Sequence, residues 1–354
     1  MPQVTQLEEI DDFVAANLDV WEKGKFEDIA QAEQELICPV ILETKKVRRI
    51  GGPHIKFTMT NKRFGNARMT GPYAQDDIKI KNILVQGAVP WRHMQGGWGY
   101  DVAEDDFSTD ETEIVDMLET RDYTSKVEMW ELLESELFSA PSSPSSNHMW
   151  GLMLWLQGDP SSSATSGSFS GGNPSGFSSG LAGIDCTLPE NAGWKNYAAN
   201  YVNASKADLI TKIKRAIRRT RWKPIVPHPQ LGFGAIMQEM MTTEAVCEAL
   251  EDIAELRNDN HRNDVARYMD QVVVAGRPVK NVWHLTNNYS TTNPILGVDW
   301  SAARFYVHRK HDMRRTGPRE DPENHNGRLV HYDFKGNLVF QRRRTSFRLD
   351  QVAA

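Results

Sequence analysis

The chain contains one short pattern of the kind that positions a catalytic serine. Residues 176–180 read GFSSG, which matches the G-x-S-x-G motif with Ser178 at its centre. In hydrolases this motif makes a sharp turn between a buried strand and a helix, so that the hydroxyl can attack a carbonyl carbon. Here the flanking residues are mostly serine and glycine, which is typical of a flexible loop. The pattern therefore indicates a chance match, and a Ser178 hydrolase is the least favoured alternative.

Other side chains that could bind a metal or transfer protons lack the spacing that such chemistry needs. His308 and His311 are near each other, but no third histidine or carboxylate stands at a spacing typical of zinc sites. Carboxylates are dense between Asp101 and Glu136, yet acid–base catalysis needs two carboxylates in different environments. No P-loop or dinucleotide-binding glycine motif occurs. The sequence predicts no enzyme activity, no catalytic residue, no cofactor and no metal site.

Composition narrows the class of protein further. The 354 residues carry a net charge of −6, which argues against a surface that binds nucleic acid everywhere. The three cysteines are too few and too scattered for a disulfide framework. No window is apolar enough for a membrane span, and the first residues lack the apolar core of a signal peptide. We expect a chain that folds in a reducing compartment, away from membranes.

Residues 39–91 show the two-residue period of strands. Ile55, Phe57 and Met59 alternate with polar residues, and so do Ile78 and Ile80. The residues between them are rich in charge and turn formers, which predicts a long hairpin with a polar tip. Because such a hairpin is poorly stable alone, it should rest on something else, of which another chain is the favoured candidate. Its tip supplies the first candidate contact residues, Lys62, Arg63, Phe64, Arg68, Met69 and Tyr73.

The stretch from Ser108 to Pro141 predicts one long helix. Ser108 and Glu111 form a capping box, no glycine or proline interrupts the stretch, and Pro141 ends it. The apolar period places Trp130 and Leu133 on the buried face.

The acidic residues of this helix are the predicted partners of the basic hairpin tip in an adjacent chain. Glu131 and Glu134 are expected on a different arc from the buried face. The candidate contact residues on the helix are Glu119, Glu128 and Glu131.

The second half of the chain mixes helices and strands. Residues 158–182 are dominated by serine and glycine, which predicts an exposed, flexible loop. A helix from Ser205 carries many basic residues, which could contact nucleic acid or an acidic neighbour, and a solvated or inter-subunit face is favoured. A second helix is expected at 243–256, and strands at 271–275, 279–285 and 301–308. Alternation at 330–340 predicts closing strands that pack on the long helix.

This order of elements resembles the major capsid protein of tailed bacteriophages, which has the HK97-type fold. The resemblance covers nearly the whole chain and rests on short words in the same order. These are VPWR at 89–92 with WGYD at 98–101, WKNY at 194–197 with Tyr201, NPI at 293–295 with VDW at 298–300, and Asn337-Leu338 with Arg342 to Arg344.

The resemblance implies an α+β architecture with named parts. Residues 1–38 would form an N-terminal arm, and 39–89 the extended hairpin called the E-loop. Residues 90–150 would form the P domain, with the spine helix at about 109–140. Residues 151–286 would form the mixed α/β A domain, which includes the loop 158–182, and residues 287–354 would return to the P domain as closing strands.

The resemblance also implies a function and partners. Copies of the chain would assemble into pentamers and hexamers of an icosahedral head that encloses double-stranded DNA without reading its sequence. A portal protein would occupy one vertex, and a decoration protein is left open. Residues 1–38 are shorter than a domain of at least about 50 residues, so a separate scaffolding protein assists, or none is used. The chain would belong to the virion and assemble in the host cytoplasm. The alternative is an encapsulin-like shell that holds cargo enzymes.

Overall fold

The computed structural model describes residues 37–43, 47–71, 78–102, 111–221, 238–255 and 272–353. By their contacts these residues fall into two compact units. Unit 1 holds the described residues within Met94–Leu132 and Met313–Asp333. Unit 2 holds those within Leu36–His93, Leu133–Asp312 and Phe334–Ala354. In this part of the chain no helix is both long and apolar enough to cross a bilayer.

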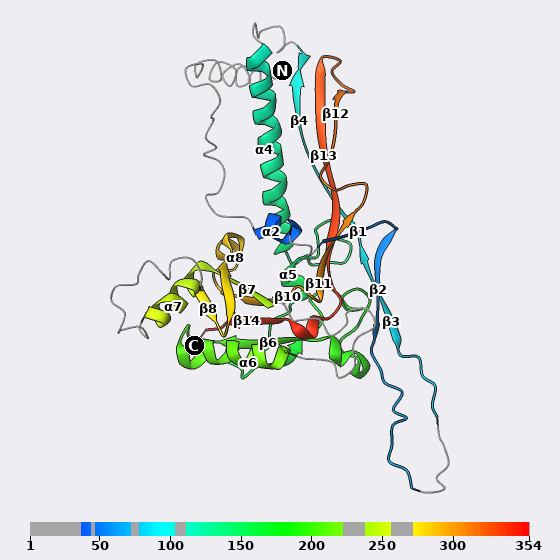
Figure 1. Ribbon diagram of the computed structural model, residues 1–354, viewed down its shortest axis with the longest axis vertical. Coiled ribbons are helices and arrows are strands. Elements are labelled where there is room, and N and C mark those ends of the chain that lie inside the picture. The colour runs from blue at the N-terminus through cyan, green and yellow to red at the C-terminus, as the bar shows by residue number, and fades with distance from the viewer. Residues whose placement is uncertain are drawn as a thin grey trace. The chain divides into compact units, whose positions relative to one another are not determined.

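Unit 1 is built on the long helix α4 (Glu111–Leu137), which passes into unit 2 at Leu133. The helix expected between Ser108 and Pro141 is therefore present, while the capping serine lies outside the described residues. Strands β4 (Arg92–Asp101), β12 (Arg314–Glu320) and β13 (Gly327–Phe340) run beside it (Figure 1). Strand β12 pairs antiparallel with β13, and β4 also pairs with β13. The predicted packing of closing strands on the long helix is thus confirmed within unit 1.

Unit 2 contains a seven-stranded mixed sheet in the order β5-β6-β14-β10-β7-β9-β8. Its central strands are buried at every residue of β6 (Asn196–Tyr201) and β10 (Ile295–Asp299). Both faces of the sheet are therefore covered there, which removes the alternation that marks a half-exposed strand. The other strands are β5 (Ser168–Gly171), β7 (Gln238–Thr242), β8 (Val272–Val274), β9 (Arg277–Asn281) and β14 (Phe347–Gln351).

Two helices cover different parts of this sheet. Helix α6 (Thr211–Thr220) packs on β6 and β14, and α7 (Glu244–Glu255) packs on β8 and β9. The start of the first helix follows the sequence prediction, because the Ser205 side chain accepts the backbone N–H of Asp208 at 3.2 Å. The predicted strand at 279–285 is wrong in its second half, where α8 (Trp283–Asn288) begins.

The remaining elements of unit 2 are short. Helix α2 (Ile37–Glu43) precedes β1 (Val47–Ile50), and β1 pairs in parallel with β11 (Ala303–His308). Helix α5 (Leu152–Trp155) is buried, and the 3₁₀ turn η1 spans Pro189–Trp194. The second part of β13 pairs with β11, with Phe340 opposite Ala303.

The predicted hairpin is present as β2 (His54–Thr60) and β3 (Leu84–Pro90), paired from His54 opposite Pro90 to Thr60 opposite Leu84. The ring of Phe57 lies against Gly87, where any side chain would collide with it. The predicted strand character of Ile78 and Ile80 is wrong, because the described residues beyond Thr60 and before Leu84 form no strand.

The serine- and glycine-rich tract differs from the exposed loop expected at 158–182. Strand β5 pairs with β6, so part of the tract belongs to the sheet. Phe177 and Leu181 are buried, and the Phe177 ring meets the Trp150 ring edge-on at 5.6 Å. A few apolar residues spaced along a polar tract therefore anchor its second half to unit 2, while serines between them, such as Ser178, stay exposed.

The exposure of α4 side chains corrects two expectations about its faces. Leu133 is fully buried, as predicted, but Trp130 is only half-buried. Glu134 was expected on an exposed arc and is instead buried, because its carboxylate accepts the backbone N–H of Cys38. A distant hydrogen-bond donor thus brings a charged residue into the interior.

Candidate assembly surfaces

The serine of the G-x-S-x-G match has no catalytic setting in the described residues. Ser178 is exposed and lies in a turn, with no strand directly before it and no helix directly after it. A nucleophile elbow needs both of these elements to hold the hydroxyl at a sharp corner. The geometry therefore agrees with a chance match.

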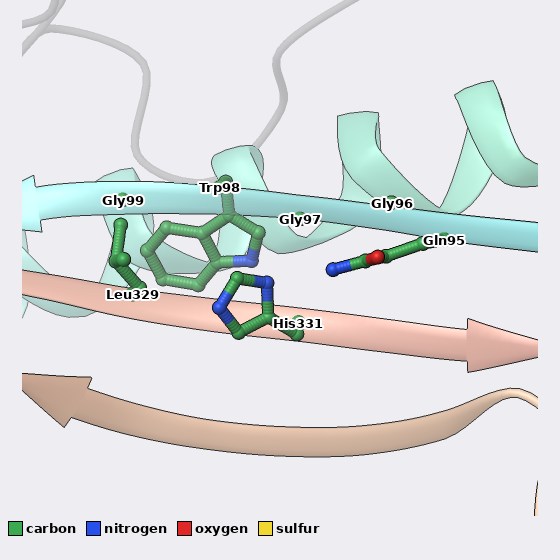
Figure 2. Close-up of a pocket in the computed structure, with 7 residues that line it drawn as sticks. All are labelled: Gln95, Gly96, Gly97, Trp98, Gly99, Leu329 and His331. Carbon is green, nitrogen blue, oxygen red and sulfur yellow. The ribbon is translucent and has the colours of Figure 1, made fainter. Parts of the chain in front are cut away.

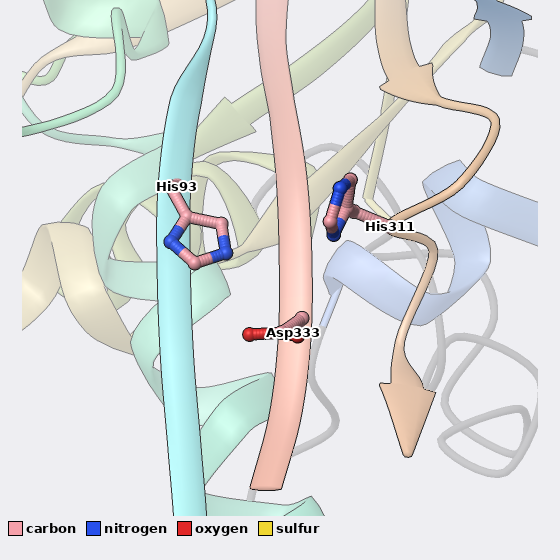
Figure 3. Close-up of side chains that lie close together, drawn as sticks. All are labelled: His93, His311 and Asp333. Carbon is pink, nitrogen blue, oxygen red and sulfur yellow. The ribbon is translucent and has the colours of Figure 1, made fainter. Parts of the chain in front are cut away.

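Histidines meet in unit 2 in a way that their sequence positions do not reveal. The His311 ring lies 5.4 Å from the His308 ring and 6.0 Å from the His93 ring, between centroids. Figure 3 shows His93 on β4 and His311 in the loop before β12; Asp333, drawn with them, is the last residue of unit 1.

A shallow depression lies over the paired strands of unit 1. It is lined by residues 95–99 of β4 and by Leu329 and His331 of β13 (Figure 2). Gly97 is required there, because a Cβ atom would lie 2.5 Å from the carbonyl oxygen of Val330. His331 is the one titratable side chain in its lining, so the depression has no acid–base pair. Gly97 and Gly99 are explained by the close approach of β13, and Gly96 by the Met129 side chain of α4.

Asp122 joins α4 to the strands of unit 1. Its carboxylate accepts the indole N–H of Trp98 at 3.3 Å and the hydroxyl of Tyr332, and it pairs with Lys126 Nζ at 2.6 Å. Arg315 Nε of β12 lies 3.3 Å from the same carboxylate. Partial burial raises the pKa of Asp122, but these donors outweigh it and the pKa is lowered. The polar interruption in the apolar period of the helix is therefore a structural contact.

The base of the hairpin packs on its own chain. The Phe57 ring stacks on Trp194 at 5.9 Å, and the Ala88 N–H donates to the Ala182 carbonyl oxygen at 3.1 Å. Lys62 Nζ forms an ion pair with Glu190 Oε1 at 2.6 Å. The expectation that the hairpin leans on other residues is thus confirmed for its base, where η1 and the segment before it in the same chain, rather than another chain, provide the support.

Beyond its base the hairpin exposes large apolar side chains. The exposed fractions are 42% for Phe64, 101% for Met69, 73% for Ile78, 92% for Ile80 and 56% for Leu84. The sequence named Phe64 and Met69 but missed the other three, since alternation with lysine suggested a strand with one covered face. An apolar surface of this kind on an extended loop is typical of a contact with another protein.

The other predicted contact residues lie as follows. Arg63 and Arg68 are exposed on the same loop, and Tyr73 lies outside the described residues. On α4, Glu128 is exposed and Glu131 is half-buried, whereas the side chain of Glu119 is not described. Of the basic tip residues, Lys62 already has an acidic partner within its own chain.

Comparison with solved structures identifies the fold. The chain aligns with the capsid protein of cyanophage A-1(L) over 94% of its own length and 97% of the other, with a TM-score of 0.63 and 14% identity. It aligns with the capsid of a native GTA particle over 94% and 96%, with a TM-score of 0.59 and 9% identity. The chain aligns with an encapsulin of Synechococcus elongatus over 96% of its own length and 94% of the encapsulin, with a TM-score of 0.50 and 9% identity.

No protein-family model matches the chain, and no curated protein matches its sequence. The similarity is therefore one of fold, because sequence identities of 14% and 9% are too low for a match by sequence alone. The resemblance to phage capsid proteins read from the sequence is confirmed at that level, over almost the full length of the chain.

Proposed function

We propose that the chain is the major capsid protein of a tailed double-stranded DNA bacteriophage. Its copies form the pentamers and hexamers of an icosahedral head around the genome. The observation that carries the proposal is the hairpin, whose loop exposes five large apolar side chains and gains no core from its own strands. The shared fold with phage capsids supports the same conclusion. In this assignment the chain belongs to the virion, and it assembles in the host cytoplasm with a portal protein at one vertex.

The hairpin contact is proposed to be mainly apolar, with charge setting its orientation. Met69 and Ile80 enter a neighbouring copy, and Arg63 and Arg68 approach the acidic side of its long helix at Glu128 and Glu131. Because Lys62 pairs with Glu190 in its own chain, it positions the base of the loop. Exposed ion pairs contribute only about 0–1 kcal/mol each, so apolar burial dominates the affinity.

Sedimentation of purified chains tests this assignment. Met69→Ser with Ile80→Ser should leave the circular dichroism spectrum unchanged and should abolish assembly. The control is Val273→Ser, which changes a side chain that is 59% exposed on β8, outside the hairpin. Normal particles from the double variant would remove the hairpin from the assembly contact.

The second candidate is an encapsulin-like shell, which the fold similarity to an encapsulin favours. The two candidates differ in contents. Particles recovered from the native host should hold nuclease-protected DNA under the first assignment and protein cargo under the second. Particles filled with an enzyme and free of DNA would overturn the phage assignment.

A further inference from the structure

Helix α6 presents a basic face on which, among the described residues, Lys212 alone has an acidic partner, Asp208 at 2.5 Å. Ile213, Ala216 and Ile217 bury its other face against the sheet. Its outward residues and those flanking it are basic, with exposed or half-exposed side chains. They are Lys206, Lys214, Arg215, Arg218, Arg219 and Arg221, and no ion pair within the described residues engages them.

Helix α7 presents the opposite charge. Val246 and Leu250 are buried, and the outward face carries Glu244, Glu248, Glu251 and Asp252. The pKa of Cys247 is raised to about 11, first by burial and then by the negative charges of Glu251, Glu244 and Glu248. The acidic face therefore disfavours a further negative charge beside it. The described residues provide no basic partner for it either. Within the described residues, the same domain therefore has two helical faces of opposite sign whose outward charges, apart from Lys212, form no ion pair.

Both faces present charges three residues apart. Arg218 lies in the last turn of α6 and Arg221 is the residue that caps its end, while Glu248 and Glu251 both lie within α7 and on one side of it. The basic residues from 206 to 221 extend over about 24 Å and α7 over about 18 Å, at 1.5 Å per residue.

The faces lie at different ends of the sheet. Helix α6 covers β6 and β14, and α7 covers β8 and β9, with β10 and β7 between (Figure 1). At about 4.8 Å per strand, β14 and β9 are about 14 Å apart, which exceeds the Debye length of about 8 Å at physiological salt. One face cannot neutralise the other within the same chain.

We infer that the α6 face of one copy docks on the α7 face of the next copy around a ring. Equal faces repel each other, so a two-fold contact through either face is disfavoured, and a head-to-tail contact uses both. This inference rests on the proposed shell function. It assigns the head-to-tail contact between neighbouring copies in each ring of the shell. A polyanion such as DNA is the competing occupant of α6. A second copy is favoured because it also satisfies α7, whereas DNA leaves that face unpaired.

Charge exchange tests the contact on the full chain. Arg218→Glu with Arg221→Glu, and separately Glu248→Lys with Glu251→Lys, should each raise the subunit concentration needed for assembly by about ten-fold or more, as like charges meet at every contact. The chain with all four changes should assemble within about three-fold of the wild type. A 1:1 mixture of the two reversed chains should form six-membered rings, in which the two chains alternate and each meets its complement, but no five-membered rings, since an odd ring cannot alternate. Circular dichroism checks that every variant folds.

The outcomes separate this inference from the function beneath it. Two results would overturn the α6–α7 contact alone, provided that the wild type forms shells. In the first, the chain with all four substitutions assembles no better than the worse of the two double variants. In the second, both double variants assemble normally. The α6–α7 contact would also be overturned if the charge reversal on α6 abolished binding of a duplex DNA probe while assembly stayed normal. That result would assign the α6 face to nucleic acid. Wild-type chains that remain monomeric under all salt conditions overturn both the contact and the shell function.

Discussion

The carboxylate of Glu134 accepts the backbone N–H of Cys38 at 2.8 Å, across 96 residues of sequence. Glu134 is 6% exposed, and the donor of this hydrogen bond, the Cys38 N–H, lies in the first turn of α2. Desolvation raises the pKa of this carboxyl, and the N–H groups of Cys38 and Ile37 lower it by less. A buried acid thus holds α2 to the second part of α4 within unit 2.

Acidification should stabilise the folded state through Glu134, because protonation removes the cost of burying its charge. Because its folded pKa is raised, the folded state binds the proton more tightly than the unfolded state. Stability should therefore rise as the pH falls from the raised pKa toward about 4.3, the unfolded value. Glu134→Gln keeps an acceptor oxygen without the charge and should remove this part of the pH dependence. Urea unfolding from pH 8 to pH 4 measures it, and identical slopes for both proteins would contradict the assignment.

Asp122 should respond to pH in the opposite direction. Its folded pKa is lowered, so its contribution to stability is present above about pH 3.9 and is lost as the pH falls through the lowered value. Asp122→Ala leaves Trp98 and Tyr332 without their acceptor and should cost about 2 kcal/mol at pH 7. Trp98 fluorescence during unfolding reports the loss. Glu128→Gln, at an exposed position on the same helix, is the control and should change stability by less than about 0.5 kcal/mol.

Two consecutive leucines of α4 should differ sharply in their tolerance of alanine. Leu133 is 0% exposed and Leu132 is 43% exposed. Leu133→Ala should lower the free energy of unfolding by about 2–5 kcal/mol, as a buried truncation does, and Leu132→Ala by less than about 1 kcal/mol. Denaturant titration measures the free energy of unfolding of both variants. Because both are leucine-to-alanine changes, the same number of atoms is removed in each. Equal losses would show that the face of the helix is assigned incorrectly.

Arg343 is a buried cation held by neutral groups. Its guanidinium donates to the carbonyl oxygens of Trp155 and Gly172 and to Asn196 Oδ1, at 2.7, 3.1 and 3.0 Å. Burial lowers its pKa to about 10, although the neighbouring Cys186 raises it.

Arg343→Lys should destabilise unit 2 by about 3 kcal/mol, because an ammonium cannot reproduce the planar set of donors. The adjacent Arg344→Lys is the control. Arg344 lies over the Phe169 ring at 4.1 Å, a contact that lysine can partly retain, and its loss should cost under about 1 kcal/mol. A thermal shift of similar size in both variants would contradict the role of the Arg343 hydrogen bonds.

The sequence predicted those elements whose pattern is local. The long helix, the β2–β3 pairing and the capped helix after Ser205 each carry their signal within a few turns of chain. The seven-stranded sheet was largely missed because β6 and β10 are buried on both faces and show no alternation. Of the candidate contact residues, exposure could be predicted for Met69, but the ion pair of Lys62 with Glu190 depends on a segment more than a hundred residues away.

Unit 1 has a consequence for the order of events during synthesis. Its helix and first strand come from Met94–Leu132, and the strands that cover them come from Met313–Asp333. At about 5–20 residues per second, the ribosome needs roughly 10–35 s to make the residues between. During that time Asp122 has neither Tyr332 nor Arg315 to meet, and the strand partner of β4 does not yet exist. A nascent chain therefore cannot complete unit 1 until Asp333 has been made, long after the ribosome has made α4.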